Sequence, residues 1–387
     1  MRVGVFATHP IQYQVPLWRA LNAEADIDLT GFYFSDQGIS GAEDPGFGEA
    51  VVWDTPLLEG YASQFLSREP IGKINRCKIV NLDQLLEEKS LDVVILHGYT
   101  HRFARQLIRN KRKYDYKVIL RGEFTEMPRR SSGLRSLAKR LYLNWFYHYV
   151  DHFCPIGKDA KDHLRLYGIN ENKTTLAPYS VDDALINRSI EKYDRNESRY
   201  TLGIEGDDIT FIFSGKMVQR KQPLMLAAAI LNLSKTHSNI TAIFLGSGEQ
   251  AQALSDYLEP ILGKRYIAPG FVNQTKLGLY FTAADVFVLP STYDTWGLVV
   301  NEAMHYGLPC VVSDRVGSCR DLVTCGETGE IFEFDNLEQL KACLETFIIE
   351  PRKAKSMGKK ALQRVQGYTI DKTVQGLIDS INMVCEG

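Results

Sequence analysis

The sequence lacks a run of apolar residues long enough to cross a lipid bilayer. Its most apolar stretch, Leu224 to Leu233, is well short of the roughly 20 residues that a membrane-spanning helix needs. The first residues, Met1 to Phe6, have the pattern of a β-strand rather than of a signal peptide, and polar residues follow them at once. We therefore expect a cytoplasmic location, with the inner face of a membrane as the alternative.

A cysteine framework and a charge imbalance are also missing. The seven cysteines are odd in number and scattered, without a Cys-x2-Cys pair, which excludes a disulfide scaffold and a zinc site of that type. The 45 Lys and Arg nearly balance the 47 Asp and Glu, so no whole-chain field predicts a nucleic-acid partner. What remains is a chain of 387 residues, 44% hydrophobic, with enough apolar sequence for two or three folded domains.

Short β-branched runs alternate with helical patterns along the chain, which is typical of parallel α/β folds. The expected strands are 2–7, 27–34, 92–96, 117–121, 152–156, 209–213, 241–245, 265–267, 286–289 and 310–313. Residues 183–207 are polar and charged and predict a connector. The sequence thus predicts two Rossmann-like, doubly wound domains facing a cleft, residues 1–182 and 183–367. A helix at 368–387 is expected to pack back toward the first domain.

The densest motif is residues 284–304, where an apolar strand ends at Pro290 and a helix opens near Gly297. The free N–H groups of a helix start form a natural phosphate site. Asp294 lies in the turn and Glu302 lies one to two turns inside the helix, so they can contact separate hydroxyl groups of one long ligand. The alternative is a helix-capping aspartate and a solvated glutamate.

Three further predicted strand ends carry loops of the same kind. Lys216 and Lys221 follow the strand at 209–213, where their ammonium groups can meet a diphosphate. Glycine-containing turns follow the next two strands, at 246–248 and 270–272. Taken one at a time, these loops have a structural alternative: the lysines are solvated and the glycines serve only to form tight turns. Four consecutive strand ends with such loops favour a shared ligand site.

In this order the motifs resemble the retaining glycosyltransferases of family four, the group 1 glycosyltransferases, which have the two-domain GT-B fold. The resemblance is close over about residues 210–335, including the Asp294-x7-Glu302 element, and looser over 1–182. The Pro178-Tyr179-Ser180-Val181-Asp182 segment is similar to the element that ends the family's first domain. The family motif is Glu-x7-Glu, so Asp294 keeps the charge on a side chain that is shorter by one methylene.

The resemblance implies a role for each matching residue. Glu302 would accept hydrogen bonds from the ribose hydroxyls, and Val272 would lie against the base. Lys216 and Lys221 would meet the charge of the departing diphosphate together with the helix-start amides, and Asp294 would touch the transferred sugar, which makes these three the catalytic candidates. The implied donor-binding residues are Gly215, Lys216, Lys221, Gly248, Val272, Asp294, Gly297, Leu298 and Glu302.

We expect no metal and no cofactor beyond the nucleotide sugar itself. The relatives that the motifs resemble need none, and the predicted strand ends show no cluster with metal-ligand spacing. Asp26-Ile27-Asp28 matches a metal-binding triplet of other glycosyltransferases, but it opens a strand in the wrong domain. We interpret it as coincidental.

The loops of the first half offer candidates for the acceptor side. They follow three predicted strands and comprise His9, Gln12, His101, Arg121 and Glu123. Many relatives place a histidine where this chain has Arg121-Gly122-Glu123, so no histidine is assigned as catalytic. For His9, a structural role in capping the turn is an equal alternative. For Arg121 and Glu123, the equal alternative is a structural ion pair between them.

The region 102–140 holds 13 Lys or Arg and three acidic residues. Such a surface suits an anionic lipid surface or a lipid-linked acceptor. The alternative is a domain helix whose apolar stripe is core and whose basic residues are solvated.

The sequence therefore predicts a retaining, metal-independent hexosyltransferase that moves a sugar from a nucleoside-diphosphate sugar to a hydroxyl acceptor, in polysaccharide or glycolipid synthesis. A nucleotide-sugar isomerase or hydrolase, or a non-catalytic nucleotide-sugar-binding protein, are the alternatives on the same fold. A dinucleotide-dependent oxidoreductase is disfavoured, because neither domain has Gly-x-Gly-x-x-Gly after its first strand.

Overall fold

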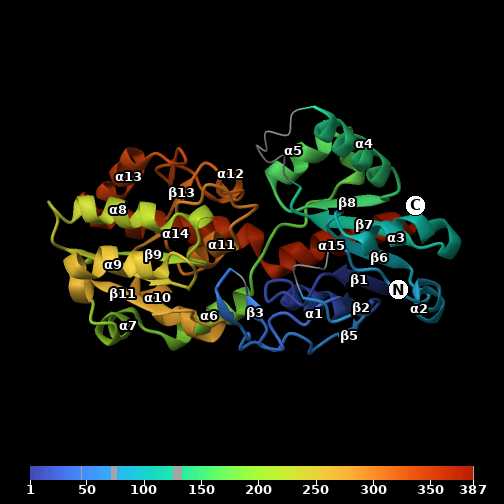
Figure 1. Cartoon of the computed structure of the whole chain (residues 1–387), viewed down its shortest axis with the longest axis horizontal. Coiled ribbons are helices and arrows are strands. Elements are labelled where there is room, and N and C mark those ends of the chain that lie inside the picture. Colours follow the sequence, from blue (N-terminus) through green and yellow to red (C-terminus); the bar gives the residue numbers. More distant parts are fainter. Residues whose placement is uncertain (45, 71–75, 125–132, 387) are drawn as a thin grey trace. The chain divides into compact units, whose positions relative to one another are not determined.

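The computed structural model describes residues 1–44, 46–70, 76–124 and 133–386, and within them the chain divides into two units (Figure 1). Unit 1 comprises Met1–Ser40, Pro56–Tyr179 and Ile370–Gly387, and unit 2 comprises Gly41–Thr55 and Ser180–Thr369. The sequence placed residues 41–55 in the first domain. In the structure they cluster with unit 2, because they pack on its loops.

Unit 1 is built on a parallel sheet with the strand order β5-β2-β1-β6-β7-β8. Its strands are β1 (Arg2–Ala7), β2 (Asp28–Tyr33), β5 (Ala62–Phe65), β6 (Val93–His97), β7 (Lys117–Gly122) and β8 (His152–Pro155). Its helices are α1 (Val15–Asn22), α2 (Leu82–Lys89), α3 (Arg102–Tyr114), α4 (Leu134–His148), α5 (Lys158–Leu166), the short 3-10 turn Glu171–Lys173 and α15 (Ile370–Glu386). Helix α15, red in Figure 1, packs on α1, β7 and β8, and the Thr373 hydroxyl donates to the Pro178 carbonyl at 2.6 Å.

Unit 2 repeats this architecture with the strand order β11-β10-β9-β12-β13-β14. Its strands are β9 (Ile209–Ser214), β10 (Ile240–Leu245), β11 (Tyr266–Gly270), β12 (Val286–Leu289), β13 (Cys310–Ser313) and β14 (Gly329–Phe332), with the separate hairpin β3 (Glu43–Asp44) and β4 (Glu49–Ala50). Its α-helices are α6 (Asp183–Lys192), α7 (Arg195–Thr201), α8 (Pro223–Leu233), α9 (Ala251–Leu262), α10 (Leu277–Ala283), α11 (Leu298–His305), α12 (Cys319–Leu322), α13 (Leu337–Ile349) and α14 (Pro351–Val365). Its 3-10 turns are Gln219–Lys221, Gly263–Arg265, Gln274–Lys276 and Gln366–Tyr368.

The central strands of both sheets are buried on both faces, which explains their near-continuous apolar sequences. Residues 93–96 in unit 1 and 286–289 in unit 2 are each fully buried. In unit 2 the chain leaves β9 toward β10 on one side, and β12 lies on the other side of β9. The carboxyl ends of β9 and β12 therefore flank a topological switch point, which is where open parallel sheets bind ligands. This doubly wound α/β fold in two units is the predicted one.

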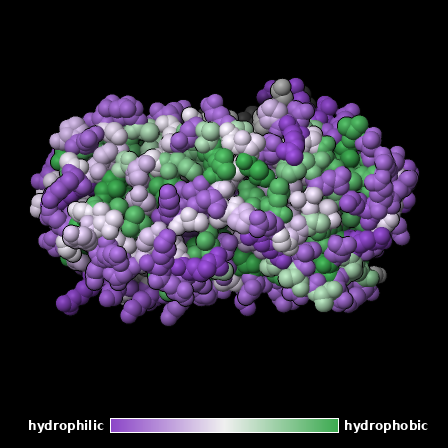
Figure 2. Space-filling view, turned by 90° about the horizontal axis from the view of Figure 1, so that it is seen from below, coloured by the Kyte–Doolittle hydropathy of each residue, from purple (hydrophilic) through white to green (hydrophobic). Residues whose placement is uncertain are grey.

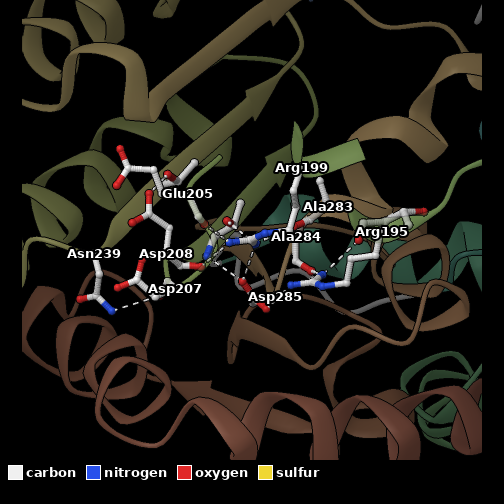
Figure 3. Close-up of polar contacts among 12 residues, drawn as sticks. Arg195, Arg199, Glu205, Asp207, Asp208, Asn239, Ala283, Ala284 and Asp285 are labelled. Carbon is white, nitrogen blue, oxygen red and sulfur yellow. Dashed lines mark hydrogen bonds and ion pairs between the residues drawn. The ribbon is translucent and has the colours of Figure 1, made fainter. Parts of the chain in front are cut away.

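The polar region 183–207, predicted as a connector, instead forms helices α6 and α7 of unit 2. A charged network fixes α7 against the sheet (Figure 3). The Arg195 guanidinium lies 2.6 Å from the Asp285 carboxylate, Arg199 lies 3.4 Å from it, and the same carboxylate accepts the Thr210 N–H at 2.9 Å. Charged side chains of this segment thus form ion pairs that hold α7 against the sheet, which the composition alone did not indicate.

Hydrophilic residues predominate on the face drawn in Figure 2, with smaller hydrophobic areas between them. Among the described residues, no helix combines the length and the apolar character that a membrane span requires.

Candidate donor-binding site

The loops after β9 and β10 form one surface because glycine lets them approach closely. Gly246 has φ +127°, and a Cβ at this position would lie 2.0 Å from the Gly215 carbonyl oxygen. The Met217 N–H also donates to the Ser247 carbonyl at 2.8 Å. Only glycine fits at position 246. Because the two predicted glycine turns pack against each other there, Lys216 and Gly248 lie in adjacent loops.

Lys221 and Asp294 form a hydrogen-bonded ion pair across the switch point. Lys221 ends the 3-10 turn after β9, Asp294 lies in the loop after β12, and their side chains are 12% and 11% exposed. The backbones of the two loops are joined as well, since the Thr292 N–H donates to the Arg220 carbonyl at 2.9 Å. The structure thus brings together two of the predicted catalytic residues, one on each side of the switch point.

Gly297 positions the start of α11 against this pair. It caps the helix with φ +84°, and a Cβ here would lie 3.0 Å from Val316 and 3.7 Å from the Asp294 carboxyl carbon. The amides of Leu298 and Val299 are the first of the helix and have no carbonyl acceptor in a preceding helical turn, whereas the Val300 N–H already donates to the Gly297 carbonyl at 2.9 Å. A negatively charged group at this point would meet both these amides and the Lys221 ammonium.

Glu302 lies in the second turn of α11 and is only 3% exposed. The helix cap is Gly297, whereas the Asp294 backbone bonds to Arg315 and Gly317. The alternative of a capping aspartate with a solvated glutamate is therefore wrong: Asp294 does not cap the helix and Glu302 is not solvated. Both carboxylates thus lie buried beside the carboxyl end of β12, where oxygen acceptors can also meet the hydroxyl groups of a ligand.

Lys216 has a carboxylate partner different from that of Lys221. Its ammonium lies 2.6 Å from the carboxylate of Asp44, a residue of the inserted segment 41–55. The remaining predicted donor residue, Val272, is half-buried in the loop after β11, next to Phe271. Local sequence patterns indicated the lysines, but nothing in them indicated Asp44.

In unit 1 the acceptor-side candidates follow β1, β6 and β7 but are not equivalent. Arg121 is 1% exposed, with its guanidinium 5.1 Å from the centre of the Tyr179 ring. The Gln14 amide donates to His97 Nε2 at 2.7 Å. Burial, together with the nearby charge of Arg121, lowers the pKa of His97 to about 3, so its imidazole is neutral at pH 7. Sequence reasoning placed Arg121 here but gave no role to Gln14 or Tyr179. Tyr179 stands in the element that ends the first domain, but nothing in that pattern indicated a contact with Arg121.

The other acceptor-side candidates are less buried. His9 Nδ1 lies 2.9 Å from the Thr8 hydroxyl, and Gln12 is half-buried in the turn before α1. His101 precedes α3 and stacks on Phe103 with the rings 5.0 Å apart; burial lowers its pKa. Glu123 is half-buried just after β7. Residues 125–132 of the basic region lie outside the described residues.

Over the described part of the chain, one group of acidic side chains is close enough to share a cation: Glu205, Asp207 and Asp208 (Figure 3). It precedes β9 and so lies at the opposite end of the strands from the glycine loops. Lys264 lies 2.8 Å from Glu205, and Arg265 lies 3.2 Å from Asp208. Because these cations already offset the acidic charge, we interpret the group as structural.

Comparison with known proteins finds glycosyltransferases. Residues 194–364 match the family "Glycosyl transferases group 1". A D-inositol 3-phosphate glycosyltransferase of Catenulispora acidiphila is 26% identical over 240 residues, which are 59% of this chain and 56% of that protein. The matches to the first three curated relatives span 41% to 56% of their length.

Two solved structures share the fold over nearly the whole chain. Sucrose-phosphate synthase from Thermosynechococcus elongatus has a TM-score of 0.75 at 16% identity, covering 99% of both chains. Anabaena HepE, solved in complex with UDP and glucose, has a TM-score of 0.71 at 16% identity, also covering 99% of both chains. The predicted resemblance is confirmed: residues 194–364 match the group 1 glycosyltransferase family, and the chain has the GT-B fold.

Proposed function

We propose that this protein is a retaining glycosyltransferase that moves a sugar from a nucleoside-diphosphate sugar to a hydroxyl acceptor without a metal ion, in the synthesis of a polysaccharide or glycolipid. The observation that carries the proposal is the Lys221–Asp294 pair beside the start of α11, at the switch point of a group 1 glycosyltransferase domain. This arrangement offers a cation and helix amides to a diphosphate, and a carboxylate to a sugar.

The proposed reaction breaks the bond between the anomeric carbon and the diphosphate oxygen, which keeps the electron pair. A new bond forms from the acceptor oxygen to the same carbon, and the acceptor proton is released. Lys221 stabilises the negative charge that grows on the leaving diphosphate. Lys216 stabilises the same charge once its ion pair with Asp44 is broken. Asp294 orients the sugar, and buried Glu302 accepts hydrogen bonds from the ribose.

We propose a uridine nucleotide as the first donor to examine, because HepE, which shares the fold, was solved with UDP and with UDP-glucose. The test is thermal unfolding of the protein with UDP, GDP or ADP. A nucleotide present at about 100 times its dissociation constant adds about 2.7 kcal/mol to the stability. We expect one nucleotide to raise the midpoint equally for the wild type and for Glu259→Ala, a matched exposed helical glutamate, and to raise it clearly less for Glu302→Ala.

Lack of stabilisation by every nucleoside diphosphate at millimolar concentration would refute the donor assignment. With the donor identified, the retaining outcome is read from the anomeric proton coupling of the product in NMR spectra. An inverted product would refute the mechanism while leaving the donor site in place.

We propose further that the face formed by α3 and α4 contacts an anionic membrane that carries the acceptor. Leu137 and Leu141 are 55% and 62% exposed on α4, and Arg135 and Arg140 are exposed on the same helix. Exposed leucines among arginines suit an interfacial helix. Flotation with vesicles containing phosphatidylglycerol should recover the wild type and lose the Leu137→Ser/Leu141→Ser variant. Equal recovery of both would refute the contact and leave α4 as an ordinary domain helix.

A further inference from the structure

Residues 41–44 and 46–55 form a segment that we call the acidic strap. The chain leaves unit 1 after Ser40 and returns to it at Pro56, and the residues between belong to unit 2 (Figure 1). The strap contains the short antiparallel hairpin of β3 and β4. An insertion that packs on the other unit is held there by its contacts with that unit. The residues that it contacts therefore indicate which site it affects.

One end of the strap is anchored by side-chain to main-chain hydrogen bonds. The Asn273 amide donates to the Val52 carbonyl at 2.6 Å and accepts the Asp54 N–H at 3.1 Å. The Asp54 carboxylate in turn accepts the Thr275 N–H at 3.2 Å and the Thr275 hydroxyl. These paired bonds fix residues 52–54 to the loop after β11.

Aromatic rings extend this anchor toward the predicted base site. The Phe47 and Trp53 rings lie 5.0 Å and 5.6 Å from the ring of Phe271, in edge-on arrangements. Such edge-on pairs stabilise the contact beyond the area that they bury. Phe271 precedes Val272, so the rings adjoin the residue expected to lie against the nucleotide base.

The other end of the strap lies on the two loops predicted to bind the diphosphate. The Asp44 carboxylate is 2.6 Å from the Lys216 ammonium, and the Glu49 carboxylate accepts the Ser247 hydroxyl. A Cβ at Gly248 would lie 3.1 Å from the Gly46 carbonyl, so the strap backbone is in close contact with the glycine turn. This contact leaves no room for a phosphate group between Gly46 and Gly248.

Asp44 is bound as an anion. Burial alone would raise the pKa of its carboxyl group, but hydrogen bonding to Lys216 and to the Gly46 N–H, together with the charge of Lys216, outweighs burial and lowers it. The side chains of Lys216 and Asp44 are 35% and 19% exposed. The pair is therefore within reach of water and can be separated by a competing anion.

We propose that the acidic strap occupies part of the donor site when no donor is bound, with Asp44 and Glu49 on Lys216 and Ser247 where the diphosphate has to bind. This inference rests on the proposed function. The donor displaces residues 42–44 and 46–49 from the two loops, which also separates Phe47 from Phe271, while residues 52–54 stay anchored to Asn273 and Thr275. In the absence of donor, the strap excludes other anions from the diphosphate site.

The first test is calorimetric titration with UDP of the full-length wild type, Asp44→Asn and Glu43→Gln. Asparagine keeps the hydrogen-bond acceptor for the Gly46 N–H but loses the charge that holds Lys216. Exposed or half-buried ion pairs contribute up to about 1 kcal/mol, and charge-assisted hydrogen bonds more, so Asp44→Asn should bind UDP about three- to tenfold more tightly. Glu43→Gln, a neighbouring exposed carboxylate, should match the wild type.

The second test is hydrogen exchange of peptides that cover residues 41–55. We expect UDP to increase exchange over residues 42–49 of the wild type and to leave residues 52–54 unchanged. Protection of residues 42–49 by UDP, or UDP affinity that is unchanged or weaker in Asp44→Asn, would overturn the proposal. Glu49→Gln gives an independent reading if Asp44→Asn folds poorly, and it should also tighten binding.

Lys216→Ala separates this inference from the donor assignment. If Lys216→Ala binds UDP more weakly while Asp44→Asn and Glu49→Gln bind it as the wild type does, the donor site stands and the strap proposal is wrong. If the wild type and Asp44→Asn both fail to bind UDP, GDP and ADP, the proposed function fails and the strap proposal fails with it.

Discussion

Loss of the Lys221 charge should destabilise unit 2 by more than the loss of an ordinary lysine. In Lys221→Met the Asp294 carboxylate, 11% exposed, loses the cation that it contacts. Removing one member of a buried pair costs about 3–5 kcal/mol, and because about a tenth of each side chain is exposed we expect the lower end of this range. Asp294→Asn should cost less, since its amide still accepts a hydrogen bond from Lys221.

The double variant Lys221→Met/Asp294→Asn removes both charges and should be more stable than the sum of the single effects predicts. Contacting residues typically show coupling energies of about 0.5–3 kcal/mol. Urea unfolding of the four proteins at pH 7 measures this coupling. Lys276→Met serves as a control for an exposed lysine and should stay within about 0.5 kcal/mol of the wild type. Strictly additive effects would mean that the pair contributes nothing specific, and the site geometry described above would be refuted.

The same variants separate the two roles in transfer. Only interactions that are stronger in the transition state raise kcat, so Lys221→Met should lower kcat more than it raises the donor KM. One lost electrostatic contact of this type is worth about 10²–10³ in rate. Asp294→Asn should impair transfer while leaving the affinity for sugar-free nucleotide nearly intact. Wild-type turnover in a folded Lys221→Met protein would exclude this lysine from catalysis.

Three further predictions concern the nucleotide, metals and pH. Glu302→Ala should weaken binding of the nucleoside diphosphate by roughly 1.5–3 kcal/mol in calorimetry, and unchanged affinity would remove Glu302 from the site. Turnover should be the same with and without EDTA, and activity that returns only with Mg²⁺ or Mn²⁺ would contradict a metal-independent reaction. His97 has a folded pKa of about 3 against an ordinary 6.5, so its contribution to stability is present above pH 6.5 and is lost as the pH falls toward 3. Between pH 7 and 5 the unfolding free energy of the wild type should fall by about 2 kcal/mol more than that of His97→Gln, and parallel profiles would contradict the burial of a neutral imidazole.

The central strands were predictable because burial on both faces leaves a strong local signal. The strands Val286–Leu289 and Cys310–Ser313 have the predicted bounds. Strand β6 is shifted by one residue from its predicted bounds, and β7 extends one residue beyond its predicted end. Sequence reasoning missed β5 and β14, which lie at sheet edges. Ala62–Phe65 is mostly exposed and Gly329–Phe332 begins with a glycine and a glutamate, so neither shows the apolar run of an interior strand.

The lysines of the site were predictable from their position after a strand, but their partners were not. Lys221 pairs with Asp294 across 73 positions of sequence and Lys216 pairs with Asp44 across 172, whereas hydrophobic periodicity carries information over about 18 residues. The two partners also differ in kind. Asp294 lies in a loop joined to that of Lys221 by the backbone hydrogen bond from the Thr292 N–H to the Arg220 carbonyl. Asp44 belongs to an insertion whose hairpin end contacts unit 2 through the Lys216 ion pair, the Ser247 hydroxyl and the Phe47 ring, and we propose above that the donor displaces this end. The sequence suggested two equivalent lysines, whereas under the strap proposal Lys221 is the fixed element of the site and Lys216 is the lysine that responds to the donor.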